Sequence, residues 1–442
     1  MKFSVACNFD YALLDGLAPY PVYEIYGKLT SDYFGGGRPS FYLPEVGREA
    51  LARYVAETRK RGIGFNYLLN ASSMSNMEFT SEGQKKMNEL LDWLDGINVD
   101  SVTVSNLFFL KLIKRRYPGL KVRISSHRYT DNPRKIRFWK DAGADYIVVS
   151  EVNIHREFRV LEEMRKAAGD DVELQLIVNN WCRQDCAIAG NHAVGLSAAS
   201  QKRSRGFPLD FCSLYCNYIR LTDPVNYLRA NWIRPEDIKI YEDMGYENFK
   251  IVERNTPTAV LLERVKAYHD RRYDGNLMDI IQNYAYPFHK FTEREKDAFS
   301  KRRMFKYFMK PKAVNLVKFM KVVKFGEKGN VLFPLIGENP VHIDNRKLDG
   351  FIDHFKKHGC QNRDCESCRY CHKQAEKAVS IDPKWKKEML DIYENLQEEI
   401  YGGGFWEGYT DTAMKLLANR DNARDEFQED FENFRHALRA MP

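Results

Sequence analysis

Several common signatures are missing from this chain. No run of 18 or more apolar residues occurs, so we expect no segment that spans a membrane. The first ten residues lack the basic stretch, apolar stretch and cleavage site of a secretory signal, and we expect a cytoplasmic protein. The HExxH pattern of zinc proteases and the GxSxG pattern of serine hydrolases are absent from the 442 residues. These absences argue against hydrolases that depend on either motif.

Cysteine is scarce outside two short groups. Of the nine cysteines, only Cys7 stands apart, and its place in an apolar run predicts a small buried residue. The others form a first group, Cys182, Cys186, Cys212 and Cys216, and a second group, Cys360, Cys365, Cys368 and Cys371. The cytosol keeps thiols reduced, which argues against a disulfide framework. Four thiolates suit an iron-sulfur cluster or a zinc ion, so we predict two metal sites.

The first cysteine group consists of two CxxxC pairs separated by 25 residues. Residues four apart share one face of a helical turn, so each pair directs two sulfurs towards a common centre. This spacing is wider than the CxxC of zinc ribbons, and it favours a 4Fe-4S cluster over zinc. We interpret His192, close by in the sequence, as a loop residue.

The second cysteine group reads CxxxxCxxCxxC. Three cysteines at two-residue intervals are typical of ferredoxin loops, and Cys360 supplies a fourth thiolate locally. A second 4Fe-4S cluster and a zinc ion are both compatible with the spacing. Such a site acts as a structural staple or relays electrons.

Strand-like and helix-like patterns alternate over the first 255 residues. Apolar runs predict strands at residues 3–8, 63–69, 101–106, 121–126, 146–151, 173–179 and 249–253. Amphipathic patterns between them predict helices at residues 45–61, 83–94, 108–117, 132–142 and 152–168. Seven or eight such units predict an α/β fold, a TIM-like (β/α) barrel, with an open doubly wound sheet as the alternative.

Polar residues follow several of these strands. In such barrels the active site lies at the carboxyl ends of the strands, and strand 173–179 leads almost directly to Cys182. His127, Arg128 and Glu151 are candidates there for binding or proton transfer. Each of them is individually also compatible with a cap or a loop hydrogen bond.

Positive charge concentrates between Lys296 and Lys328, which contain eleven basic residues and two acidic ones, with aromatic residues interleaved. This pattern suits single-stranded nucleic acid, but it also fits an amphipathic element with solvated lysines, which we favour. We divide the chain into four parts: a (β/α) barrel carrying the first cysteine group (1–255), a basic, aromatic-rich connecting region (256–350), a cysteine-rich cluster-binding segment or knob (351–379) and a charged helical tail (380–442).

Several sequence blocks resemble peptidase family U32. They are VNNWCRQDC at 178–186, CSLYC at 212–216, WIRPE at 232–236 and FKIVER at 249–254, while YDGN, IDNRKLDGF and GCQNRDCESCRYC resemble a subset of that family. The resemblance implies a barrel whose Cys182, Cys186, Cys212 and Cys216 bind a 4Fe-4S cluster. It also implies that Glu253 and Arg254 orient an anionic substrate, although a buried ion pair that closes the barrel is the equal alternative.

This resemblance implies more than one kind of activity. The family is named for collagenase-like proteolysis, yet similar proteins take part in oxygen-independent hydroxylation of the ubiquinone ring and of RNA bases, with prephenate as a proposed oxygen donor. We therefore expect an anaerobic iron-sulfur oxidoreductase acting on a small molecule or RNA. The alternatives are a peptidase, or an RNA- or peptide-binding modification partner with a structural cluster. A protein partner or a homo-oligomer is compatible with each of these.

Overall fold

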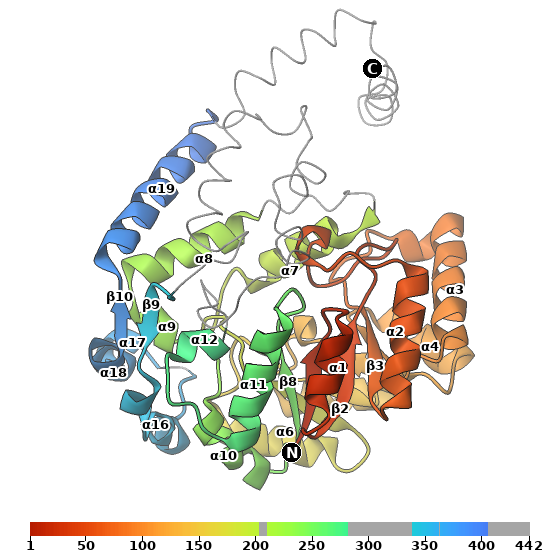
Figure 1. Cartoon of the computed structure of the whole chain (residues 1–442), viewed down its shortest axis with the longest axis horizontal. Coiled ribbons are helices and arrows are strands. Elements are labelled where there is room, and N and C mark those ends of the chain that lie inside the picture. The colour runs from red at the N-terminus through yellow and green to blue at the C-terminus, as the bar shows by residue number, and fades with distance from the viewer. Residues whose placement is uncertain (203–209, 282–337, 362, 405–442) are drawn as a thin grey trace, which may run out of the picture.

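A closed barrel of eight parallel strands forms the centre of the computed structural model, which describes residues 1–202, 210–281, 338–361 and 363–404 (Figure 1). The strands follow chain order, and β1 pairs with both β2 and β8. Their bounds are β1 Lys2–Ala6, β2 Val22–Gly27, β3 Gly64–Leu69, β4 Ser101–Val104, β5 Lys121–Ile124, β6 Tyr146–Val148, β7 Glu173–Ile177 and β8 Asn248–Ile251. The TIM-like barrel is confirmed, and the open doubly wound sheet is excluded.

Strand β2 was missed by the sequence analysis. Its sequence, VYEIYG, places Glu24 in the middle of the strand, where a charged residue interrupts an apolar run. The structure buries Glu24 inside the barrel and pairs it with Arg123 of β5, so the charge is satisfied rather than exposed. A buried ion pair between strands far apart in the sequence leaves no local pattern.

The Glu24–Arg123 pair belongs to a polar network within the barrel. Ser4 and Ser101 donate hydroxyl hydrogen bonds to the two carboxylate oxygens of Glu24, at 2.7 and 3.0 Å. Arg123 also donates to the hydroxyl of Tyr23 at 3.0 Å. Both charged side chains are almost inaccessible to solvent, so removing either partner leaves a buried charge unpaired.

Amphipathic helices surround the barrel and bury their apolar faces against it. Side-chain caps begin several of them, as where Asn132 accepts hydrogen bonds from two backbone amides at the start of α5. Helix α11 closes the ring by packing against β1, β8 and α1. Their bounds are α1 Tyr11–Leu17, α2 Arg48–Lys60, α3 Ser81–Gly96, α4 Leu107–Arg116, α5 Pro133–Ala142, α6 Phe158–Ala168, α10 Ile238–Asp243 and α11 Thr258–Asp270.

The connection from β7 to β8 is the longest in the barrel and carries the first cysteine group. It contains α7 Ala189–Ser200, α8 Phe211–Thr222 and α9 Val225–Leu228 before α10. In Figure 1, α7 and α8 lie at the opposite end of the barrel from the N-terminus. Helix α7 is fixed there because Ser197 accepts from the amide of Ser72, while Ser200 accepts from the amide of Gly36. The mouth of the barrel is thus partly covered by its own insertion.

The described part of the C-terminal region packs along one side of the barrel (Figure 1). Its elements are α12 Leu277–Ile280, β9 Val341–Ile343, α16 Phe351–His358, α17 Cys365–Cys368, α18 Tyr370–Ala378, β10 Val379–Ile381 and α19 Pro383–Tyr401. The buried guanidinium of Arg234 anchors it by donating to Asn345 Oδ1 at 2.7 Å and to the Leu348 carbonyl at 2.6 Å. The cysteine-rich C-terminal region with helices is therefore confirmed.

Some predictions fall outside the described residues. The basic region between Lys296 and Lys328 and the distal part of the charged tail are among them. The division of the chain into four parts stays a prediction. Within the described ranges, no helix has both the length and the apolar character that a membrane crossing requires.

The buried ion pair gives a test of the barrel interior. Replacing Glu24 with Gln should lower the free energy of unfolding by about 3–5 kcal/mol, because Arg123 loses its only buried counter-charge in this network. Urea unfolding measures the change. As a matched control, Glu57→Gln removes an exposed partner of Lys60 and Arg61 and should change the free energy of unfolding far less, because solvent screens this pair. Equal losses in the two variants would contradict the assigned role of the pair.

Candidate functional site

The carboxyl ends of the strands bring together the site residues predicted from sequence. His127 follows β5, Glu151 follows β6 and Cys182 follows β7, while Glu253 and Arg254 follow β8. The side chains of His127, Glu151 and Arg254 are buried. Residues separated by more than one hundred positions thus meet at one end of the barrel, where active sites of this fold lie.

Arg38, in the loop between β2 and α2, connects these residues and was missed by the sequence analysis. Its Nε donates to Glu253 Oε2 at 2.7 Å. Burial is the larger influence on the pKa of His127, Glu151 and Cys182, and the Arg38 charge lowers all three. The three glycines that precede Arg38 were the available signal, because glycine permits a close approach of the backbone.

Glu253 and Arg254 are adjacent in sequence but differ in the partners of their charged groups. Burial raises the pKa of Glu253, yet Arg38 and Arg254 outweigh it, so the pKa is lowered and the carboxylate is ionised. Burial lowers the pKa of Arg254 to about 10. Arg254 is 4% exposed, and its Nη1 has no hydrogen-bond partner among the described residues. A buried guanidinium with a free donor is suited to binding an anion.

His127 is neutral at the mouth. Burial lowers its pKa to about 3, and the positive charges of Arg38 and Arg128 act in the same direction. Its Nδ1 lies 3.4 Å from the hydroxyl oxygen of Ser72. Gly37 packs so closely that a Cβ atom there would lie 2.5 Å from Cε1 of the ring. The imidazole is therefore held in place by the glycine loop, and in its neutral form one ring nitrogen can accept a hydrogen bond.

Lys250 and Glu151 form a second buried titratable pair below the mouth. Burial lowers the pKa of Lys250 to about 7, and its ammonium lies 3.9 Å from the centre of the Tyr26 ring. Burial raises the pKa of Glu151, against the opposing charges of Arg38 and Lys250. A buried amine whose pKa is lowered to about 7 is suited to accepting a proton near neutral pH. Sequence analysis identified Glu151 but not Lys250, which looks like an ordinary strand lysine.

The first cysteine group lies beside this cluster of charges. Cys182 and Cys186 lie in the segment between β7 and α7, and Cys212 and Cys216 lie one turn apart on α8. Burial raises the pKa of Cys182, and the neighbouring charges of Glu151 and Cys216 raise it further. Burial and Asp210 raise the pKa of Cys212, with Cys186 and Cys216 acting in the same direction. The four thiols are thus close enough to act on one another electrostatically.

Two further contacts position the first cysteine group. Arg220, stacked 4.2 Å above the Trp181 ring, donates from Nη1 to the Cys216 sulfur at 2.7 Å. Asp210 caps α8 by accepting from the Cys212 amide, and its other oxygen lies 2.5 Å from His192 Nδ1. The prediction that His192 is a loop residue was wrong, because it lies on α7 and reaches the start of α8.

In the second cysteine group, Cys360 follows α16, Cys365 and Cys368 lie on α17, and Cys371 lies on α18. Burial raises the pKa of Cys360 to about 12, and it also raises that of Cys371. Arg156 lowers both pKa values, while the other thiols of the group raise them. Cys368 Sγ lies 3.7 Å from His354 Nε2. The four thiols of this group are therefore also mutual neighbours.

Arg156 is the buried cation of the second cysteine group and was not predicted. Its guanidinium lies 4.9 Å from the ring centres of both Trp232 and Phe355 and 5.0 Å from that of Phe351. Only 2% of the residue is exposed. A cation held among aromatic rings beside thiols stabilises negative charge on those sulfurs.

The donor chemistry fits a tetrathiolate group at each site. In the described ranges no three His, Cys, Asp or Glu side chains are arranged as ligands of a single metal ion. Each group nevertheless supplies four mutually interacting thiols and one buried arginine, Arg220 or Arg156, that offsets thiolate charge. Soft thiolates of this kind are the ligands of iron-sulfur clusters and of structural zinc.

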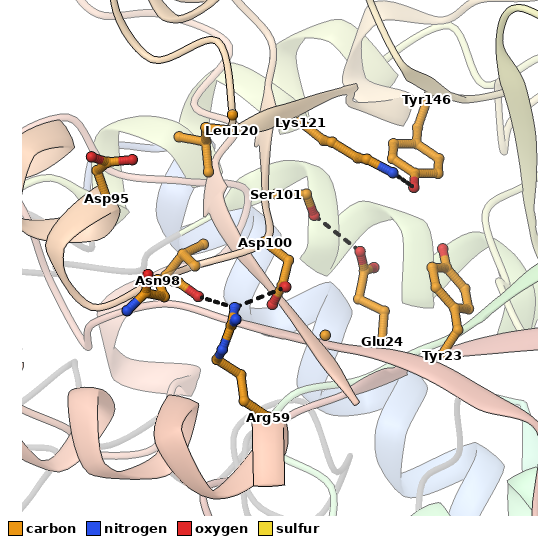
Figure 2. A pocket seen from close by; sticks show the side chains of 13 residues that line it. Tyr23, Glu24, Arg59, Asp95, Asn98, Asp100, Ser101, Leu120, Lys121 and Tyr146 are labelled. Atoms are coloured by element: carbon orange, nitrogen blue, oxygen red, sulfur yellow. Dashed lines mark hydrogen bonds and ion pairs between the residues drawn. The ribbon is translucent and has the colours of Figure 1, made fainter. Parts of the chain in front are cut away.

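A separate cavity of about 540 Å³ opens at the amino ends of β2 to β6 (Figure 2). There Arg59 donates to the Asn98 carbonyl and to Asp100, and Ser101 donates to Glu24. The cavity is lined by Tyr23, Glu24, Arg59, Gly64, Asp95, Asn98, Val99, Asp100, Ser101, Gly119, Leu120, Lys121 and Tyr146. Residues at this end of such barrels support stability rather than catalysis, and several of these side chains already pair with one another.

The chain is similar in sequence to known proteins. The model of peptidase family U32 matches residues 41–204, a stretch that contains Cys182 and Cys186. A protein named uncharacterized protease MJ1657, from Methanocaldococcus jannaschii, is 27% identical over 359 residues, which are 81% of this chain and 89% of that protein.

Two other similar proteins share less with the chain. The tRNA hydroxylation protein P1 of Bacillus subtilis is 21% identical over 200 residues, which are 43% of this chain and 44% of that protein. The chain thus spans less than half the length of this relative. Among solved structures, the U32 peptidase Mk0906 has a TM-score of 0.43 at 20% identity, covering 58% of this chain and 94% of that one.

The buried lysine predicts a specific pH dependence. The pKa of Lys250 is about 7 in the folded protein and 10.5 in the unfolded chain, so the unfolded chain binds more protons between these values. Lys250 therefore makes stability rise with pH across this interval, and Lys250→Met should reduce that slope. Chemical denaturation at several pH values measures it. The exposed Lys266, replaced with Met, should leave the slope unchanged, and a wild-type slope in Lys250→Met would contradict the prediction.

The contact between Gly37 and His127 predicts a steric effect. A methyl group at position 37 would collide with the imidazole, so Gly37→Ala should cost about 1–3 kcal/mol and shift the His127 ring resonances. Urea unfolding and NMR spectra of the ring protons measure the two effects. Gly47→Ala is the matched control, because a Cβ atom there meets nothing within 4 Å. Unchanged His127 resonances would show that the loop does not hold the ring.

Proposed function

We propose that the protein is an iron-sulfur enzyme for oxygen-independent hydroxylation, on the basis of the match of residues 41–204 to the model of peptidase family U32. Its substrate is a small molecule or an RNA base, bound at the barrel mouth, and related redox modifications belong to the same proposal. The observation that carries the proposal is the buried Arg254, whose Nη1 has no partner among the described residues. Its neighbour Arg38 acts electrostatically on both Arg254 and Cys182. An anion site thus lies beside a thiolate group.

The first cysteine group supports the cofactor in this proposal. Cys182, Cys186, Cys212 and Cys216 would hold a 4Fe-4S cluster, which supplies one-electron chemistry when bound. Arg220 donates to the Cys216 sulfur, and hydrogen bonds of this kind stabilise thiolate charge and tune the potential of a cluster. The second cysteine group holds another cluster or a zinc ion.

Charged residues at the mouth support binding of a carboxylate. Arg254 offers an unpaired Nη1 donor, while Arg38 is already paired with Glu253. Guanidinium groups bind carboxylates well, which supports Arg254 as the carboxylate-binding residue. Glu253 holds Arg38 in position, so the substrate carboxylate is directed to Arg254. This division of roles favours a small anionic molecule, such as an oxygen donor, over a neutral one.

Proton transfer completes the proposed chemistry. Hydroxylation breaks a C–H bond and releases protons, so the site needs groups that accept them near neutral pH. Lys250, with a pKa of about 7, and Glu151, whose pKa is raised, are buried at the mouth and act on each other.

An RNA substrate is supported by the printed function of one relative, the tRNA hydroxylation protein. The basic region between Lys296 and Lys328 is the candidate contact with phosphates. Binding of a tRNA transcript that weakens steeply as salt is added would favour RNA as the modified molecule. Salt-independent affinity for small anions alone would favour a small substrate.

Anion binding gives the sharpest test of the proposed function. The anaerobically purified protein, titrated calorimetrically with prephenate, should bind it, and Arg254→Gln should weaken binding by about 10- to 100-fold through loss of a charge-assisted hydrogen bond. Arg254→Lys keeps the positive charge but loses the planar guanidinium group. Its affinity for prephenate should therefore lie between that of the wild type and that of Arg254→Gln.

The control for this experiment is Arg271→Gln, which removes an exposed arginine paired with Glu242. Its affinity for prephenate should equal that of the wild type. Iron content is measured in every variant, so that loss of the cluster is separated from loss of the anion site. Equal affinity in wild type and Arg254→Gln would defeat the assignment of the mouth as an anion site.

Peptide hydrolysis is a second candidate function, favoured by the contact between Ser72 and His127. The 3.4 Å separation between the Ser72 hydroxyl and the neutral imidazole is that of a nucleophile and a base before substrate binds. A peptidase of this kind would retain activity in Cys182→Ser and lose it in Ser72→Ala. The redox enzyme proposed above should instead lose activity in Cys182→Ser and retain it in Ser72→Ala. The two variants therefore distinguish the two candidate functions.

A further inference from the structure

Residues 228–231 form a short segment that lies between the two cysteine groups. On one side, the Asn231 amide donates to the carbonyl of Cys182 at 2.9 Å. The neighbouring residue, Ala230, pairs with Arg183 as an antiparallel bridge. The loop that carries the first cysteine group is therefore hydrogen-bonded directly to this segment.

The other side of the same segment contacts the second cysteine group through Arg156. The guanidinium donates to the carbonyls of Leu228 and Ala230, at 2.6 and 2.7 Å. The same guanidinium acts electrostatically on Cys360 and Cys371. Two hydrogen bonds and one peptide unit thus join the Cys182 backbone to the cation beside the second group.

Arg229 makes an independent connection between the groups. Its carbonyl accepts from the amide of Gln184, two residues after Cys182, at 2.8 Å. Its side chain reaches the other way, with Nη2 3.2 Å from His372 Nε2 and 3.6 Å from Glu366. Gln184 lies two residues from Cys182, and His372 directly follows Cys371. The backbone and the side chain of Arg229 thus contact residues next to the first and the second cysteine group, respectively.

The second cysteine group also reaches the surface. Helix α17 begins at Cys365 and ends at Cys368, with Glu366 and Ser367 between them. The Glu366 side chain is 70% exposed. Arg369, at the end of this turn, is 48% exposed. A protein carrier is therefore able to approach the second group from solvent, whereas the first group lies at the partly covered mouth.

Oxygen-independent hydroxylation creates a need for such a path. When water, drawn from solvent or released by dehydration of a donor, supplies the oxygen, one C–H bond and one O–H bond break, a C–OH bond forms, and two protons and two electrons are released. The protons pass to basic side chains at the mouth, but the electrons require an acceptor outside the protein, since molecular oxygen takes no part. One-electron centres placed between the mouth and the surface meet this need.

We propose that Cys360, Cys365, Cys368 and Cys371 bind a 4Fe-4S cluster that relays single electrons between the first cysteine group and a one-electron carrier protein docking at α17. The relay rests on the redox function proposed above. Each electron released at the mouth reduces the iron of the second group and then leaves to the oxidised carrier, twice per hydroxylation. Arg156 is the positioning residue, because its buried charge stabilises the reduced, more negative state.

Metal analysis is the first part of the experiment. Full-length protein purified without oxygen should contain about eight irons and no zinc, and Cys365→Ser/Cys368→Ser should lose about four of them. Four irons with one zinc would overturn the relay and leave the proposed function intact. Iron in the second group but none in the first would instead defeat the proposed function.

Electron paramagnetic resonance tests the connection between the groups. In dithionite-reduced wild type, two neighbouring clusters should give a spectrum broadened by magnetic interaction. Cys365→Ser/Cys368→Ser should show the sharper signal of an isolated cluster at the first group. Two independent, unbroadened signals in the wild type would overturn the relay.

Potentiometric titration tests the role of Arg156. Arg156→Gln should shift the second cluster to a lower reduction potential, because the reduced state loses a stabilising positive charge, while the first cluster shifts less. Arg156→Lys keeps a positive charge and should restore most of the potential, and Arg271→Gln is the surface control. If Arg156→Gln folds with full iron content and an unchanged potential, Arg156 has no part in the relay.

Discussion

Pairing of β8 with β1 is the contact on which the site depends. It aligns Val5 with Ile251 and closes the barrel, so the residues that follow β8 come to lie beside the loop that follows β2. Glu253 reaches Arg38 only because of this closure. An open sheet of the same strands would leave β1 and β8 at different edges, and the ion pair would not form.

The two ends of the barrel treat buried charge in opposite ways. At the amino ends of the strands, Arg123 is neutralised by Glu24 within a hydrogen-bonded network, as expected of a structural pair. Nε of Arg123 lacks a hydrogen-bond partner, as Nη1 of Arg254 does, but the charge of Arg123 is neutralised. At the carboxyl ends, Lys250 and Arg254 form no ion pair among the described residues, and burial lowers the pKa of both. Burying groups in this state costs stability, and such groups concentrate where ligands bind. The asymmetry favours the mouth as the working end.

Much of this arrangement was predictable. Alternating strand and helix patterns predicted the barrel, and the positions after the strands predicted His127 and Glu151 at its mouth. Strand β2 was missed because Glu24 breaks its apolar pattern, and Arg38 was missed because a loop arginine has no local signature. Arg156 looked like an ordinary polar residue of the helix predicted at residues 152–168. Each of these residues is recognisable only through a partner distant in the sequence.

The sequence by itself determined the chemistry that is available: eight cysteines in two groups, and a repeating βα pattern that buries apolar strands. Local spacing and periodicity carry this information, because they act within a few residues. Only the tertiary structure decided that Arg38 meets Glu253 and that residues 228–231 hold Cys182 on one side and Arg156 on the other. Those contacts follow from strand register and from the free-energy cost of leaving a buried charge unpaired. Both operate between segments that are far apart in the chain.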